Sequence, residues 1–321
     1  MPGQTIPVPE GRPTFAGFPR CGDLAGLDAD VAVLGVPYGV PYDMEGSTSP
    51  SSTAPAAVRE ESRRFARYLG HYDLDLGGEL FAGRDVRAVD CGDVAMTPGR
   101  YEANNAATTA AVRTFLDRGA VPIVLGGDHA VPIPVLRAYE GHGPVCLVQI
   151  DAHLDWRDEI GGVREGLSSP MRRASEMPWI RGMAQIGLRG VGSARREEFE
   201  AATSYGSVLI RAAELHREGV EAVLDRLPAA DRYYVTLDAD GLDPSIAPGV
   251  GYPAFGGVTY DQAFDLFRGI AARGAVVGFD VVEIRPAVDV RGLTSLLAAR
   301  LILNLLGLLA REGRIGRPVG G

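Results

Sequence analysis

The sequence predicts an α/β protein built around a parallel sheet of eight strands, and two features of the chain lead to this class. Short runs rich in β-branched residues alternate with longer helical stretches along the chain, as in repeated strand–helix units. The runs are apolar throughout rather than alternating, which is typical of strands that helices cover on both faces. The expected strands are Val31–Val36, Val86–Asp90, Val121–Leu125, Val145–Ile150, Ala184–Arg189, Val208–Ile210, Tyr233–Asp238 and Val276–Val282.

The helices between these strands complete the α/β pattern. They are expected at Ala54–Arg67, Asn104–Arg118, Pro132–Tyr139, Pro170–Glu176, Arg195–Thr203, Val220–Arg226, Asp261–Arg273 and Leu293–Arg311. Eight parallel strands can close into a barrel or remain an open sheet, and the pattern alone does not separate the two. In both, function lies at the carboxyl ends of the strands. The 321 residues fit one large domain, and the 46% of hydrophobic residues provide a sizeable core.

Charge and composition exclude several classes of function. The net charge of −9 argues against a nucleic-acid partner. All 32 basic residues are arginine, so no lysine is available for a Schiff base or a P-loop. The start, MPGQTIPVPEGRP, does not resemble a signal peptide, and three separated cysteines predict free thiols, so we expect a cytoplasmic protein. The apolar segment Leu293–Ala310 contains Arg300 and Asn304, which predicts a buried or oligomer-facing helix and no membrane span.

Polar residues follow four of the expected strands directly. In QIDAHLDWRDE, residues 149–159, Asp151, His153 and Asp155 occupy alternate positions after an apolar run. Extended residues at this spacing project from one face, so the three side chains converge. The other three strands end in similar groups, namely Asp128 and His129, then Asp238, Asp240 and Asp243, then Asp280, Glu283 and Arg285.

This gathering of carboxylates and imidazoles predicts a metal centre. Crowded carboxylates repel one another unless a cation compensates their charge. Oxygen and nitrogen donors without a thiolate suit Mn²⁺, or Co²⁺ or Ni²⁺, better than structural zinc. Six side chains are more than one catalytic ion needs, and two bridged ions would use them all. The six candidates are His129, Asp151, His153, Asp155, Asp238 and Asp240.

Each motif by itself has a plainer interpretation. The Gly-Gly pair before Asp128 most often indicates a turn. The aspartates of DADGLDP can likewise form an Asx turn before the proline. A single D-x-H-x-D at a strand end is more often a loop than a metal site. Their joint occurrence at successive strand ends favours the metal centre.

Four segments resemble the signature blocks of the ureohydrolases, the arginase and agmatinase family, and are nearer the agmatinase branch. These segments are GGDHA (126–130), DAHLD (151–155), LDADGLDPSIAPGVGYPAFGG (237–257) and DVVEIRP (280–286). VAVLGVPYGVPYDM (31–44) and the helix PAAVREES extend the resemblance over most of the chain. It implies one three-layer α/β/α domain over residues 1–321 with an eight-stranded, mostly parallel, arginase-like sheet and an irregular arm at about 1–29. It also implies a homotrimer or homohexamer.

The resemblance implies a role for each matching residue. His129 and Asp155 would hold one metal ion, His153 and Asp240 the other, and Asp151 and Asp238 would bridge the two. In the family mechanism, a hydroxide between the ions attacks the guanidinium carbon and releases urea and an amine. Glu283 matches the glutamate that orients the guanidinium, and Asp155 matches the suggested proton shuttle. The implied cofactors are two divalent ions, most often Mn²⁺.

The departures from the family pattern fall among the substrate contacts. Leu167 stands where many members carry a histidine that assists proton transfer or substrate binding, and leucine can do neither. Tyr252 replaces a threonine and would narrow the pocket or stack on a planar guanidino or amidino group. The loop from Trp156 through Asp158 to Glu159 is either a substrate contact, which we favour, or a solvated loop. Arg285 either pairs with a substrate carboxylate or, as we expect, with Asp289.

The sequence therefore favours a binuclear-metal amidinohydrolase that cleaves a C–N bond of a guanidino or amidino compound. Agmatine, a guanidino acid, free guanidine and a biguanide all remain open as its substrate. The alternative is a non-catalytic metal-binding subunit of a mixed oligomer, which Leu167 motivates. A purely structural role for the metal has no positive support.

Overall fold

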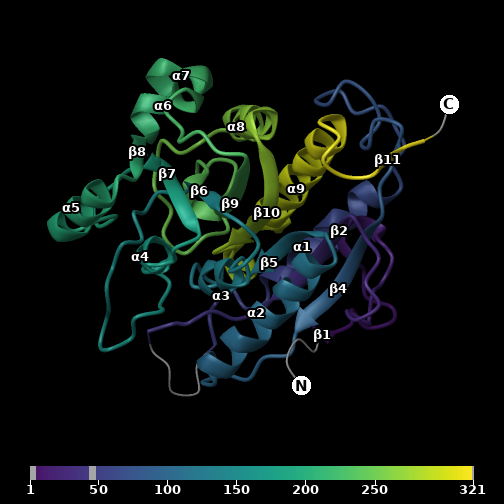
Figure 1. Cartoon of the computed structure of the whole chain (residues 1–321), viewed down its shortest axis with the longest axis horizontal. Helices are drawn as coiled ribbons and strands as arrows, with labels where there is room; N and C mark the ends of the chain where they lie inside the picture. Colours follow the sequence, from purple (N-terminus) through teal and green to yellow (C-terminus); the bar gives the residue numbers. More distant parts are fainter. Residues whose placement is uncertain (1–4, 43–47, 320–321) are drawn as a thin grey trace.

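The computed structural model describes residues 5–42 and 48–319. Its centre is a nine-stranded sheet, which runs through the middle of Figure 1. The strands of this sheet are β1 (Thr5–Ile6), β2 (Val31–Val36), β4 (Ala88–Val94), β5 (Val121–Gly126), β6 (Val145–Ile150), β7 (Ile180–Leu188), β8 (Val208–Arg211), β9 (Arg232–Asp238) and β10 (Ala275–Val282). A separate ribbon pairs β3 (Arg84–Asp85) with β11 (Arg317–Pro318). Residues 1–4 of the expected arm and Asp43 and Met44 of the family-like segment lie outside the described residues.

The strand order is β1-β4-β2-β5-β10-β9-β6-β7-β8. The eight expected strands all pair in parallel, whereas the ninth, β1, pairs antiparallel with β4 at one edge. The sheet is open, with β1 and β8 at its edges, so the barrel alternative was wrong and the predicted α/β/α class is confirmed. The arm expected to be irregular contributes β1 and a 3-10 turn at Phe15–Gly17.

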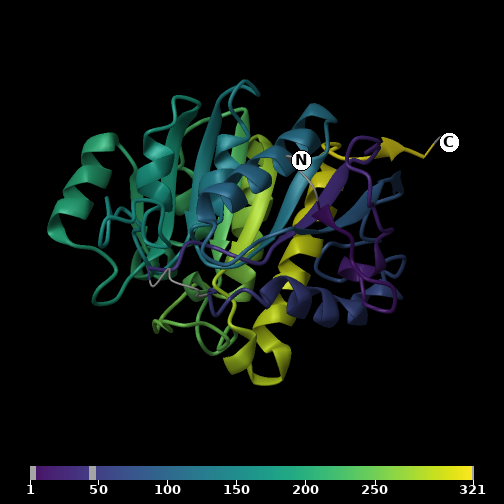
Figure 2. The ribbon, with the colours of Figure 1, turned by 90° about the horizontal axis from the view of Figure 1, so that it is seen from below.

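Helices cover both faces of the sheet and make three layers (Figure 2). They are α1 (Ala54–Ala66), α2 (Tyr101–Asp117), α3 (Pro132–Arg137), α4 (Pro170–Ser175), α5 (Arg196–Tyr205), α6 (Ala212–Glu218), α7 (Val220–Leu224), α8 (Tyr260–Arg273) and α9 (Leu293–Arg311). One buried cluster joins the sheet to α1 and α6–α9, and a second joins its other face to α2–α5. Helix α6 was not predicted; Glu214 caps its start by accepting from the backbone N–H of Arg211 at 2.9 Å.

Helix α9 carries the longest apolar segment of the chain. Among the described residues, the stretch Val290–Arg311 is long and apolar enough to cross a membrane, but most of it is buried inside the protein. It packs against α1 and α8 beneath the sheet. A helix that is hydrophobic all round is expected in the core of a large domain, so the prediction of a buried helix is confirmed.

The order of the strands brings the polar groups at their ends to one place. Strands β5, β10, β9 and β6 are neighbours at the centre of the sheet, and each ends in one of the polar groups singled out above. Their registers align the ends closely, with Val281 beside Leu125, Val282 beside Asp238 and Ile150 beside Leu237. Since the strands are parallel, all four groups emerge at the same edge, as ligand-binding residues do in open α/β sheets.

Candidate metal centre and substrate cavity

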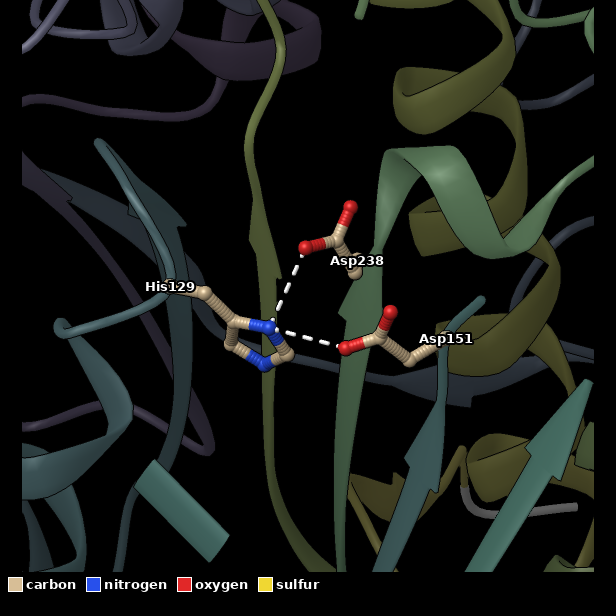
Figure 3. A group of neighbouring side chains, drawn as sticks. All are labelled: His129, Asp151 and Asp238. Carbon is tan, nitrogen blue, oxygen red and sulfur yellow. Dashed lines mark ion pairs between the residues drawn. The ribbon is translucent and has the colours of Figure 1, made fainter. Parts of the chain in front are cut away.

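The first group of possible ligands contains His129, Asp151 and Asp238, and one ring nitrogen of His129 faces both carboxylates (Figure 3). The His129 Nδ1 atom is 3.0 Å from Asp151 Oδ2, 3.1 Å from Asp238 Oδ2 and 2.8 Å from Asp155 Oδ2. The imidazole is 1% exposed, and among the described residues Nδ1 has no partner with hydrogen-bond geometry. A buried nitrogen without a hydrogen bond is costly, and a cation among these three carboxylates would satisfy it.

The other side of the His129 ring is fixed by a hydrogen-bonded chain. Asp280 Oδ1 accepts from the Thr236 hydroxyl at 2.6 Å, and Thr236 Oγ1 lies 3.2 Å from His129 Nε2. Because the threonine proton is committed to Asp280, its oxygen is free to accept from Nε2–H. With Nε2 protonated, the lone pair of Nδ1 points at the carboxylates. Metal-binding histidines are commonly oriented in this way, by a hydrogen bond from the ring nitrogen that does not bind the metal.

A second group of possible ligands contains Asp151, His153 and Asp240. His153 Nδ1 lies 3.2 Å from Asp240 Oδ2 and 3.5 Å from Asp151 Oδ1. Asp151 therefore belongs to both groups, as expected for a residue between two ions. Gln149 donates to its Oδ2 at 2.6 Å, and the backbone N–H of His153 donates to its Oδ1 at 2.6 Å. Asp238, the other expected bridge, belongs to the first group only, with His129 and Asp151.

Two site residues adopt left-handed backbone conformations that non-glycine residues rarely use. Asp155 has φ 53° and Glu283 has φ 62°. Such conformations cost about 1–3 kcal/mol and persist where the surroundings impose them. The carbonyl of Asp155 accepts from the backbone N–H groups of Met171 and Arg172 in α4, and the N–H of Glu283 donates to the Gly127 carbonyl at 2.9 Å. Neighbouring backbone thus holds both carboxylates in place.

Burial and mutual repulsion shift the pKa values of the cluster. Burial, with Asp151 close by, raises the pKa of Asp155 to about 6, and burial with Asp240 and Asp151 raises that of Asp238 well above its usual range. Burial alone would lower the pKa of His153, but contact with Asp151 and Asp240 raises it to about 12. The pKa of His129 is also well above 6.5, because the charge of Asp155 and its neighbours outweighs burial. The cluster retains protons that a divalent cation would displace.

Glu283 lies beside this cluster without belonging to either group. Its Oε1 accepts from the backbone N–H of His129 at 3.0 Å, and its Oε2 accepts from the Ser51 hydroxyl at 3.5 Å. Burial and the neighbouring Asp128 raise its pKa to about 8. Asp128 is itself fixed by the N–H groups of Val40 and Ala130. Glu283 is thus a buried carboxylate with capacity for a cationic partner.

A cavity of about 860 Å³ opens onto the centre, and His129, His153, Asp155, Asp238, Asp240 and Glu283 line it. Two of the expected substrate contacts, Leu167 and Tyr252, lie on its wall as well. Trp156 also borders it but is 2% exposed, and its indole N–H donates to Gln185 at 2.7 Å. Most of the Trp156 side chain therefore packs behind the cavity surface and supports the wall.

Two expectations about charged residues do not match the structure. Asp158 is absent from the cavity wall; its carboxylate pairs at 2.6 Å with Arg173, which α4 brings to the loop, and at 3.1 Å with Arg164, which precedes α4. Arg285 does not pair with Asp289, whose oxygens accept from the N–H groups of Thr294 and Ser295 at the start of α9. Asp243 forms the Asx turn weighed above, accepting from Ser245 N–H at 3.0 Å.

Several supporting residues had no clear signal in the sequence. Arg189 donates to the carbonyls of Asp240, Gly241, Leu242 and Ala254 and so ties the loops behind the ligands together. The Tyr42 hydroxyl accepts from Ser168 N–H at 3.0 Å and fixes the loop that carries Leu167. Thr236 was detectable in principle, since it lies two residues before Asp238 on the same strand face.

Known proteins share both this sequence pattern and this fold. The arginase family model matches residues 29–307. The chain is 32% identical to a guanidinobutyrase of Pseudomonas aeruginosa over 96% of this chain and 95% of that one, and 32% identical to an agmatinase of Bacillus anthracis over 84% and 89%. The structure of proclavaminate amidinohydrolase from Streptomyces clavuligerus superposes with a TM-score of 0.81 at 30% identity, covering 97% of this chain and all of that one.

The chain therefore belongs to the arginase family. It is a hydrolase of the class that acts on guanidino carbon–nitrogen bonds, and the resemblance drawn from the four sequence motifs is confirmed.

Proposed function

We propose that the protein is a binuclear-metal amidinohydrolase that releases urea and an amine from a monosubstituted guanidine. The observation that carries the proposal is the buried Nδ1 of His129, which faces three carboxylates and has no hydrogen-bond partner among the described residues. A second histidine–carboxylate group shares Asp151 with the first. Together they offer donors for two adjacent ions.

His129 and Asp155 would hold one ion, His153 and Asp240 the other, with Asp151 and Asp238 between them. The donors are oxygen and imidazole nitrogen only, which suits Mn²⁺ and is compatible with Co²⁺ or Ni²⁺. Two bound ions would supply a strong nucleophile at neutral pH by lowering the pKa of water.

Glu283 would bind the substrate guanidinium through paired charge-assisted hydrogen bonds, which fix the angle of the reacting carbon. Its buried position and its contact with His129 N–H prevent it from swinging away. Water adds to the guanidinium carbon, the bond from that carbon to the substituted nitrogen breaks, and the departing amine takes up a proton. Asp155, on the cavity wall, would carry that proton, since Leu167 stands where a histidine would otherwise assist.

Urea release from the purified chain tests the proposal. Protein loaded separately with Mn²⁺, Ni²⁺ or Co²⁺ is assayed with agmatine, arginine, guanidinobutyrate, guanidinopropionate, free guanidine and a biguanide, with amine release measured in parallel. We expect metal-dependent turnover that Asp151→Ala abolishes and that Asp265→Ala, on the exposed face of α8, leaves intact. Activity that survives Asp151→Ala would refute the mechanism. Bound metal without turnover on any substrate would favour the non-catalytic subunit instead.

The homotrimer or homohexamer and the cytoplasmic location complete the proposal. Light scattering on the eluting protein measures the first, and fractionation of the source cells measures the second.

A further inference from the structure

Arg285 places a guanidinium beside the cavity, and its ion pair with Glu283 is a long one. It follows β10, two residues after Glu283, and its Nη2 atom lies 4.0 Å from Glu283 Oε2. Its Nε atom is buried and has no hydrogen-bond partner among the described residues. An arginine presents five donors in a rigid fork, and leaving them unsatisfied near the protein interior is unfavourable.

The surroundings hold this guanidinium in place without using its donors. Its Cζ lies 5.2 Å from the centre of the Tyr252 ring, in the range of a cation–π contact. On another side it packs against Gly251, where an added Cβ would lie 2.0 Å from Cζ. Gly251 and Tyr252 both line the cavity. A Cβ at position 251 would displace the arginine side chain from this place.

Two other arginines line the cavity wall. Arg157 pairs with Glu198 through its Nε atom only, whereas Arg189 donates from Nε, Nη1 and Nη2 to backbone carbonyls. The one acid expected to neutralise Arg285, Asp289, instead accepts from Thr294 and Ser295. Arg285 differs from both in lying next to Glu283 with donors left for a ligand.

We infer that Arg285 binds a carboxylate of the substrate, so that the enzyme acts on short guanidino acids in preference to agmatine. The inference rests on the proposed function, in which Glu283 holds the substrate guanidinium. A ligand that contacts both Glu283 and Arg285 needs a positive and a negative end, and because the two side chains are only 4.0 Å apart, those ends must lie close together, as in a short guanidino acid. Agmatine would instead bring an ammonium toward Arg285, and like charges repel.

Kinetics on matched substrates test this. We expect wild-type protein loaded with Mn²⁺ to show at least about ten-fold higher kcat/KM for 4-guanidinobutyrate or 3-guanidinopropionate than for agmatine. Arg285→Gln should lower kcat/KM for the acids about 10–100-fold, the usual range for a lost charged hydrogen bond, and change that for agmatine less than about three-fold. Arg181→Gln, an exposed arginine near the start of β7, is the matched control and should change neither.

A binding measurement separates this inference from the proposed function. Calorimetry compares two product-like compounds that are not turned over, 4-aminobutyrate and putrescine, which differ in carrying a carboxylate or an ammonium. We expect 4-aminobutyrate to bind more tightly, and Arg285→Gln to remove the difference. Such binding without urea release from any substrate would support the inference while the proposed function fails.

Three outcomes would overturn the inference. An equal loss on acids and agmatine in Arg285→Gln would show that Arg285 only holds Glu283 in position. A wild-type preference for agmatine would contradict a carboxylate subsite directly. Neither turnover nor Arg285-dependent binding would reject both the inference and the proposed function.

Discussion

Two clusters of charged residues are buried at different places in the sheet, and only one of them is complete. Arg59 of α1 pairs with Asp90 through Nε at 2.8 Å and Nη2 at 2.9 Å, and with Asp93 at 2.6 Å. Its Nη2 also donates to the Gly92 carbonyl. At the carboxyl edge, by contrast, four aspartates surround two histidines, and His129 Nδ1 has no hydrogen bond within the described chain.

This difference indicates a structural role for the Arg59 cluster and a binding role for the cluster at the carboxyl edge. Buried charges that satisfy one another within the chain need no ligand, and removing one partner mainly costs stability. Where buried carboxylates outnumber the cations around them, they repel one another and raise one another's pKa. A further bound cation relieves this repulsion. The number of buried charges is therefore less informative than whether each has a partner.

The largest difference between the clusters is expected from Asp155→Asn. Asparagine tolerates the left-handed backbone at this position, so the fold should persist. We expect kcat for urea release to fall about 10³-fold or more, because a metal ligand and the proton carrier are lost together. The metal-free variant should be at least as stable as wild type, since one repelling carboxylate is gone. A denaturant titration that shows a large loss of stability would contradict the comparison.

Arg59→Met should have the opposite effect to Asp155→Asn, lowering stability while leaving the metal site intact. Removing the cation leaves Asp90 buried without its partner, and we expect the free energy of unfolding to fall by about 3–5 kcal/mol. The metal content of the protein that remains folded should not change. Arg63→Met is the matched control on the same helix, because its pair with Glu60 is exposed and such pairs contribute at most about 1 kcal/mol.

Thr236→Val should weaken metal binding without unfolding the protein. The change breaks the chain from Asp280 to His129, and loss of such a partner typically costs about 10–100-fold in metal affinity. Competition with a chelator measures the effect. Thr236→Ser keeps the hydroxyl and should restore most of the affinity; equal affinities in the valine and serine variants would argue against the chain.

The metal-free protein should lose stability as pH rises. Since the pKa of His153 is raised from 6.5 to about 12, the folded chain binds more protons than the unfolded chain above pH 6.5. The stabilisation is therefore complete below that pH and lost toward pH 12. We expect the Tm in EDTA to fall by several degrees from about pH 6 to pH 9, and His153→Gln to flatten this slope. Mn²⁺ should raise the Tm more at pH 8 than at pH 6, since its ligands must be deprotonated; a Tm independent of pH would contradict this account.

The smallest effect is expected from Asp158→Ala. Its carboxylate is 58% exposed and pairs with Arg164 and Arg173 away from the cavity, so KM for the best substrate should change less than about two-fold and stability by at most about 1 kcal/mol. A KM increase of ten-fold or more would return this loop to the substrate site.

The sequence by itself determined the class of fold and the identity of the candidate ligands. Strand-end position is a local property, so the D-x-H-x-D segment at 151–155 was sufficient to identify three candidate ligands. Their convergence does not come from strand alternation, because β6 ends at Ile150 and Asp155 has φ 53°. Buried apolar runs likewise identified all eight parallel strands within a few residues. Helix α6 and strand β1 were missed because their signals are short and depend on contacts made elsewhere.

Only the tertiary structure decided the order of the strands and the partners of the long charged side chains. Nothing local indicates that β5, β10, β9 and β6 are neighbours, or that Thr236 links His129 to Asp280. The same holds for Arg285 and Asp158, whose flexible side chains can reach several partners. Which partner they meet depends on α9 drawing Asp289 away and on α4 presenting Arg173, and such long-range competition leaves no pattern in the sequence.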